Sequence, residues 1–76
     1  MDNTYKKLIK FFSKNLHSIA FNEDLVIGSD KSWQQHNHRD FLSKIEKEFE
    51  VKFTDEEIKS MVSFKIIYAT LISYKE

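Results

Sequence analysis

Apolar residues recur every three or four positions along the first twenty residues, and this spacing predicts an amphipathic helix. The lysines of the segment fall largely on its opposite side. Such a stripe usually forms the core face of a bundle helix, and a basic amphipathic helix on a membrane surface is the alternative. Asp2, Asn3 or Thr4 can cap its start. The predicted core face consists of Tyr5, Leu8, Ile9, Phe12, Leu16 and Ile19, and the lysines are Lys6, Lys7, Lys10 and Lys14.

The helical periodicity breaks over residues 21–32, which we interpret as a long loop. This segment contains Gly28 together with several polar and acidic residues. A loop of this length needs anchoring to stay ordered. Its apolar run, Leu25, Val26 and Ile27, is therefore predicted to pack into the core.

A second helix is predicted from about Gln34 to Phe49, because four of its apolar residues share one face. A short connector, residues 50–53, should follow and insert two further apolar side chains into the bundle. The predicted inward residues are Phe41, Leu42, Ile45 and Phe49 of the helix, with Val51 and Phe53 of the connector.

A capping box predicts a short third helix over about Asp55–Ser60. The Thr54 hydroxyl can accept the N3 amide, and Glu57 can return a bond to the cap amide. We interpret the acidic residues 55–57 as helix-start residues and not as catalytic carboxylates. Ser63 can cap the last helix, whose predicted inward stripe is Phe64, Ile67, Leu71 and Tyr74.

Length and composition favour one small helical domain over residues 1–76, with 41 % hydrophobic residues. A single glycine and no proline disfavour a many-stranded β fold. No cysteine is present, which fits a reducing cytoplasm. The 12 basic and 12 acidic residues balance, so the basic excess of a nucleic-acid-binding protein is missing. No apolar run is long enough for a transmembrane helix, and no signal peptide is expected.

The stretch from Trp33 to Ile58 resembles the acyl carrier protein family. In that family an Asp-Ser-Leu motif opens the second helix, and its serine carries a 4'-phosphopantetheine arm. The helix then ends in Ile-Glu-x-Glu-Phe, which residues 45–49 reproduce, and an acidic helix start follows, as at residues 54–57. The resemblance implies an all-α four-helix bundle with three longer helices, one short helix and a long first loop.

In the same register, Gln34, Gln35 and His36 stand where the family has Asp-Ser-Leu. A carboxamide cannot form the phosphodiester that a serine hydroxyl forms, so Gln35 cannot carry the arm. The resemblance thus implies a degenerate carrier without a cofactor. Ser32 is the out-of-register alternative, and it would make the chain a working acyl or aminoacyl carrier with 4'-phosphopantetheine. Ser43 lies within the predicted helix, away from the exposed N–H groups of its start.

Ordinary carriers present an acidic second helix to basic patches on their enzymes, whereas this helix is charge-balanced with a neutral-to-basic start. Because charge complementarity guides partner choice, a different partner surface is expected. We therefore expect a cytoplasmic, monomeric interaction module that is not an enzyme and that binds a protein. The resemblance implies that this partner is an enzyme of a biosynthetic cluster. The predicted contact residues are Trp33, Gln34, Gln35, His36, His38 and Arg39.

Other chemistry has little support in the sequence. His36 and His38 point in different directions on a helix, and His17 lies elsewhere, so no metal site is predicted. No phosphate-binding glycine loop or nucleophile–base pair is evident. A helix-turn-helix DNA-binding protein fits the helical content but not the charge, although residues 34–39 carry some base-reading side chain types.

Overall fold

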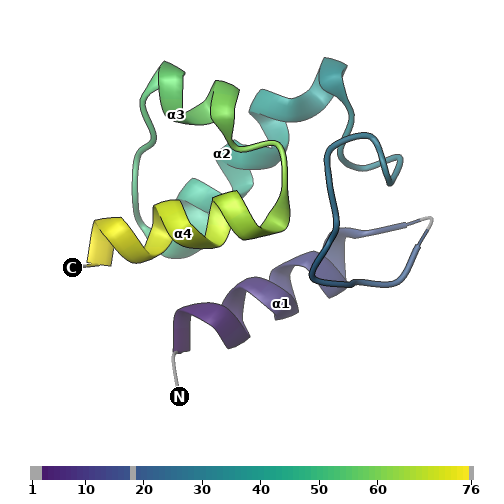
Figure 1. Ribbon diagram of the computed structural model, residues 1–76, viewed down its shortest axis with the longest axis horizontal. Coiled ribbons are helices and arrows are strands. Elements are labelled where there is room, and N and C mark those ends of the chain that lie inside the picture. The colour runs from purple at the N-terminus through teal and green to yellow at the C-terminus, as the bar shows by residue number, and fades with distance from the viewer. Residues whose placement is uncertain (1–2, 18, 76) are drawn as a thin grey trace.

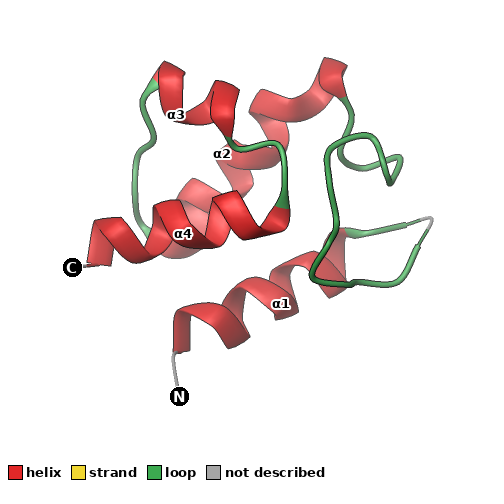
Figure 2. Ribbon diagram, in the orientation of Figure 1, coloured by secondary structure: helices red, strands yellow, loops and turns green. Residues whose placement is uncertain are grey.

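The computed structural model describes residues 3–17 and 19–75. Over these residues the chain forms four α-helices and one 3-10 helix, with no β-strand, so the all-helical prediction is confirmed. The helices α1 and α4 pack against each other, and a long loop occupies one end of the bundle (Figures 1 and 2). The elements are α1 (Asn3–Asn15), η1 (Gln35–Asn37), α2 (His38–Phe49), α3 (Asp55–Ser60) and α4 (Phe64–Lys75).

The apolar stripes of the helices meet in one core that is rich in aromatic rings. Phe12 lies at its centre, fully buried, with Trp33, Phe41 and Phe64 edge-on at centroid distances of 5.7, 5.5 and 5.4 Å. Each such pair contributes about 0.5–1.5 kcal/mol beyond the burial of its area. The other fully buried apolar residues are Leu8, Leu42, Ile45, Met61, Ile67 and Leu71.

The helix α1 is shorter than its apolar pattern predicts. It ends at Asn15, whose side-chain amide donates to the carbonyl of Phe11 at 2.8 Å. Because the helix stops there, Ile19 does not continue its core face and is 40 % exposed, so its predicted place in the core is wrong. Phe11, which the predicted stripe omits, is buried instead. The proposed cap at Asp2 lies outside the described residues.

The long loop is joined to the link between α3 and α4 through its backbone. The N–H of Ile27 donates to Val62 at 2.8 Å, and the N–H of Phe64 donates to Leu25 at 2.9 Å. Neighbouring side chains of this extended run point to opposite sides. Leu25 is therefore buried and Ile27 partly buried, as predicted, whereas Val26 is 46 % exposed and was predicted wrongly.

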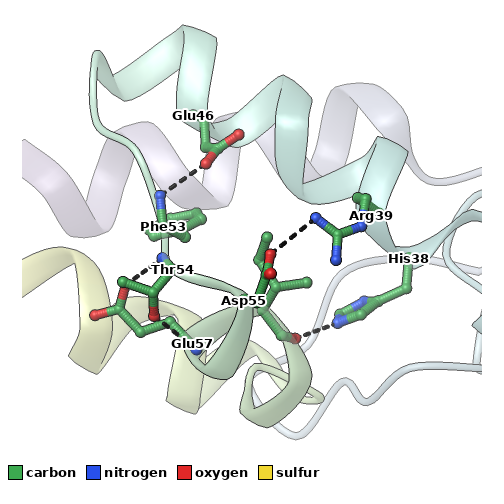
Figure 3. A network of polar contacts seen from close by, with 8 residues as sticks. His38, Arg39, Glu46, Phe53, Thr54, Asp55 and Glu57 are labelled. Carbon is green, nitrogen blue, oxygen red and sulfur yellow. Dashed lines mark hydrogen bonds and ion pairs between the residues drawn. The ribbon is translucent and has the colours of Figure 1, made fainter.

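The second helix begins later than predicted, because its first turn is the 3-10 helix η1 and α2 itself starts at His38. All four predicted core residues of α2 are buried. At its C-terminus Glu50 adopts a left-handed conformation, with φ of 56°, and its N–H bonds to the carbonyl of Glu46. The Glu46 carboxylate then accepts the N–H of Phe53 at 2.7 Å, which fixes the connector (Figure 3).

The capping box of α3 is confirmed (Figure 3). The Thr54 hydroxyl accepts the Glu57 N–H at 3.1 Å, and the Glu57 carboxylate accepts the Thr54 N–H at 2.8 Å. Ser63 caps α4 by accepting the N–H of Ile66 at 3.3 Å.

Tyr74 is 39 % exposed and does not lie in the core as predicted, because its hydroxyl bonds to polar groups at the surface. The hydroxyl shares its single proton between two acceptors, the carbonyl of Lys52 at 2.8 Å and the carboxylate of Glu57. This second bond raises the pKa of Tyr74 to about 12 and lowers the pKa of Glu57. The end of α4 is thus tied to the start of α3 by polar contacts.

Candidate functional site

The start of the second helix, where the predicted contact residues lie, is held by the loop before it. Asp30 is 2 % exposed, and its carboxylate gathers backbone N–H groups from both sides of that loop. It accepts from His17 at 3.0 Å, from Ile19 at 3.0 Å and from Ser32 at 2.9 Å. These part-buried hydrogen bonds join two segments through one buried carboxylate, which fixes the chain after α1 relative to the entry to η1.

Ser32, the alternative attachment residue, is half-buried and belongs to the same network. Its hydroxyl donates to the Asp30 carboxylate at 2.6 Å. A phosphodiester on this oxygen would remove the donor and place a negative charge beside that carboxylate. Modification of Ser32 would therefore act against the packing of the loop.

Trp33 is fully buried, so we remove it from the predicted contact residues. Its ring stacks on Phe41, with centroids 5.1 Å apart, and a buried indole needs a partner for its N–H. That N–H donates to Nδ1 of His38 at 2.9 Å, and Nε2 of His38 lies 2.6 Å from the carbonyl of Ile58. These contacts assign the neutral His38 tautomer with its proton on Nε2.

His38 is therefore an internal bridge between the loop and α3, with both ring nitrogens engaged. Figure 3 shows its bond to α3. Gln34 also faces inward in part. Its side-chain amide donates to the carbonyls of Asp30 at 2.8 Å and Gly28 at 3.3 Å, and its backbone N–H donates to Asn37 at 2.6 Å. The structure thus gives both predicted contact residues an intramolecular role.

Three of the predicted contact residues remain exposed within five consecutive positions: Gln35, His36 and Arg39. Arg39 pairs with Asp55 at 3.2 Å, with both side chains largely exposed, and such pairs add little to stability. The guanidinium therefore stays available to a partner. We call these three residues the η1 surface.

The sequence interpretation missed the roles of Asp30, which is buried, and Asn37, which is partly buried, in positioning the η1 surface. Asp30 reads as one more acid in a polar loop, and only Ser32, two positions later, gives a local signal for a side-chain-stabilised turn. The amides of residues 17 and 19 reach Asp30 from another segment, which no local pattern predicts.

Within residues 3–17 and 19–75, no group of three or more histidine and carboxylate side chains is arranged to hold a metal ion. The helices described by the structure are too short or too polar to cross a bilayer. The chain shows no significant match to any protein-family model, curated protein or solved structure.

Proposed function

We propose that this chain is an acyl-carrier-like protein-interaction module that lacks the phosphopantetheine attachment serine and is not an enzyme. The observation that carries the proposal is the position of Gln35, an exposed residue at the first position of η1. In the register of the carrier resemblance, this residue stands where the serine would be. The helical bundle with a long first loop also agrees with that resemblance.

We further propose that the η1 surface docks on a cytoplasmic protein partner, such as a biosynthetic enzyme, while the chain itself is a monomer. Gln35, His36 and Arg39 offer amide, imidazole and guanidinium groups there, which favours a partner with acceptors or negative charge. The acidic helix of ordinary carriers would instead select partners with a positively charged surface.

Phosphopantetheinylation tests the first part of the proposal. The native chain, Ser32→Ala and Gln35→Ser are incubated with coenzyme A and a broad-specificity phosphopantetheinyl transferase, and their intact masses are measured. We expect no gain on the native chain and a phosphopantetheine-sized gain on Gln35→Ser. A gain on the native chain that disappears in Ser32→Ala would instead establish a working carrier modified at Ser32. No gain on Gln35→Ser would count against the carrier scaffold.

Cross-linking in cells, followed by affinity measurement, tests the second part. Arg39→Glu is expected to weaken binding of the captured partner about tenfold or more, because charge reversal at a contact costs over about 1.4 kcal/mol. Asp55→Asn is the matched control, since it removes the Arg39 ion pair but keeps the guanidinium. Equal affinities of the native chain and Arg39→Glu would overturn the η1 surface as the docking site.

A further inference from the structure

A groove of about 760 Å³ lies between α1 and α2, away from the η1 surface, and lysines from both helices line it. Positions 7, 10 and 14 are spaced so that their side chains share one side of α1, and positions 44 and 47 share one side of α2. The two helices meet through Phe11 and Phe41, whose centroids are 5.5 Å apart. Core packing thus brings together two rows of charge: Lys7, Lys10, Lys14, Lys44 and Lys47.

This lysine groove is charged although the chain as a whole is not. Its five lysines less the single negative charge of Glu48 leave +4, whereas the whole chain sums to zero, so the remainder carries −4. A hollow lined mainly by one sign of charge concentrates the electrostatic field and attracts opposite charge. The groove is therefore a place where a negatively charged ligand would relieve the repulsion between the lysines.

The groove lysines are not neutralised from within the described part of the chain. There the ion pairs are Arg39 with Asp55 and Lys65 with Asp24, and neither involves a groove lysine. Lys7 contacts an aromatic ring instead, with its Nζ 5.0 Å from the centroid of Phe49. The ammonium groups thus retain donors for an external acceptor.

The lining also has an apolar part. Phe11 is 8 % exposed and faces the groove, and the aliphatic stems of lysines cover apolar surface while their charges stay in water. The groove therefore combines a small apolar contact with charged edges on two sides. A protein segment offers both kinds of group, whereas a small inorganic anion uses only the charge.

We propose that the lysine groove binds an acidic segment of a protein partner, with carboxylates against the lysines of both helices and an apolar side chain against Phe11. A membrane surface fits less well, because the lysines flank a hollow and a bilayer is flat. Nucleic acid fits less well because Glu48 lies in the lining and no arginine supplies the planar fork suited to phosphate. The proposal does not depend on the missing attachment serine.

The test uses the full chain and a synthetic amphipathic peptide with glutamates at helical spacing around one leucine. Binding is followed by titration calorimetry at low and physiological salt, and amide chemical shifts map the site. Lys10→Gln/Lys44→Gln removes one charge from each side of the groove. Lys6→Gln/Lys59→Gln is the matched control, with the same loss of charge at exposed positions outside the groove. Circular dichroism confirms that all variants are folded.

We expect the peptide to shift the signals of Phe11 and Asn15, and its affinity to fall about tenfold or more in Lys10→Gln/Lys44→Gln but little in the control. A glutamine-for-glutamate peptide should not bind. No peptide binding, or equal losses in both variants, would overturn the proposal. If phosphatidylserine vesicles bind more tightly than the peptide, the groove is reassigned to a membrane surface. If oligothymidylate binds more tightly than the peptide, it is reassigned to nucleic acid. A dimer that dissociates in Lys10→Gln/Lys44→Gln would reassign it to a second copy of the chain.

Discussion

Asp30 and Thr54 perform the same chemical task at two places in the molecule, and the difference between them shows which parts of a fold are local. Thr54 is exposed and exchanges hydrogen bonds with Glu57, three residues later. Asp30 is buried and holds amides from two segments of the chain, one of them more than ten residues away. The first arrangement stabilises one helix end, and the second one holds separate elements together.

The two sites differ in energy because the Asp30 carboxylate is buried and its hydrogen bonds are part-buried, whereas the bonds at Thr54 are exposed and water can replace them more readily. A buried N–H without an acceptor costs about 1–3 kcal/mol, whereas the loss of an exposed N-cap costs about 1 kcal/mol. A domain of this size has a total stability of roughly 5–15 kcal/mol. Changes at Asp30 should therefore threaten the fold, and changes at Thr54 should only weaken it.

The largest effect is expected for Asp30→Ala. It leaves the amides of His17 and Ile19 without their buried acceptor, and we expect a loss of about 3 kcal/mol or more in unfolding free energy. Urea denaturation followed by circular dichroism measures this loss. Asp24→Ala is the control, because Asp24 is an exposed acid of the same loop. Similar losses in both variants would remove the contrast between buried and exposed acceptors.

A second non-local bridge sharpens the comparison. His38→Leu leaves the indole N–H of Trp33 and the carbonyl of Ile58 unpaired, and should cost about 2 kcal/mol. His36→Leu, at an exposed position in η1, should change the unfolding free energy little. Trp33→Phe removes the indole donor, so a double-mutant cycle with His38→Leu should show coupling between the two sites. Additive losses would mean that the hydrogen bond between Trp33 and His38 does not contribute to stability.

Changes to the local capping box should cause a smaller loss of unfolding free energy than changes at Asp30. Thr54→Ala is expected to lower the unfolding free energy by about 1 kcal/mol, because the N–H of Glu57 loses its acceptor. Thr54→Ser keeps the hydroxyl and should retain most of the stability. A loss in Thr54→Ala as large as that in Asp30→Ala would contradict the distinction between the exposed acceptor Thr54 and the buried acceptor Asp30.

The smallest effect concerns pH and the bond between Tyr74 and Glu57. The folded pKa of Glu57 lies below its ordinary value of 4.5, so its contribution is present above that pH and is lost as the pH falls further. The pKa of Tyr74 rises from 10.0 to about 12, so its contribution is present below pH 10 and is lost as the pH rises.

Tyr74→Phe should therefore be less stable than the native chain mainly between these limits, and the difference should shrink at both ends of the pH range. Thermal unfolding followed by circular dichroism at several pH values measures this difference. In a Glu57→Gln background the acid-side change should disappear. A difference that stays constant across the whole range would mean that the hydrogen bond does not set these pKa values.

The local features of the fold were predictable because residues close in sequence determine them. The capping box at Thr54, the cap at Ser63 and the buried stripe of α2 follow from spacing alone. The errors occur where an element ends or where segments meet. Ile19 continues the apolar period, but α1 has already ended, so the residue is exposed.

The candidate site was less predictable for the same reason. Gln35, His36 and Arg39 are exposed as the helix start suggests, but the burial of Trp33 depends on Phe12 and Phe41 from other elements. The lysine groove depends on how α1 and α2 pack, and helical spacing alone gives only the separate rows of lysines. Sequence patterns thus predict the faces of helices better than the surfaces they form together.

The buried position of Trp33 also gives the molecule an optical reporter. It is the only tryptophan, so all indole emission comes from one fully enclosed site at the junction of the loop, α1 and α2. Its emission should be blue-shifted while that junction is closed and should move to longer wavelength when water enters. Tryptophan fluorescence therefore reports the integrity of this junction, and circular dichroism reports the helices around it.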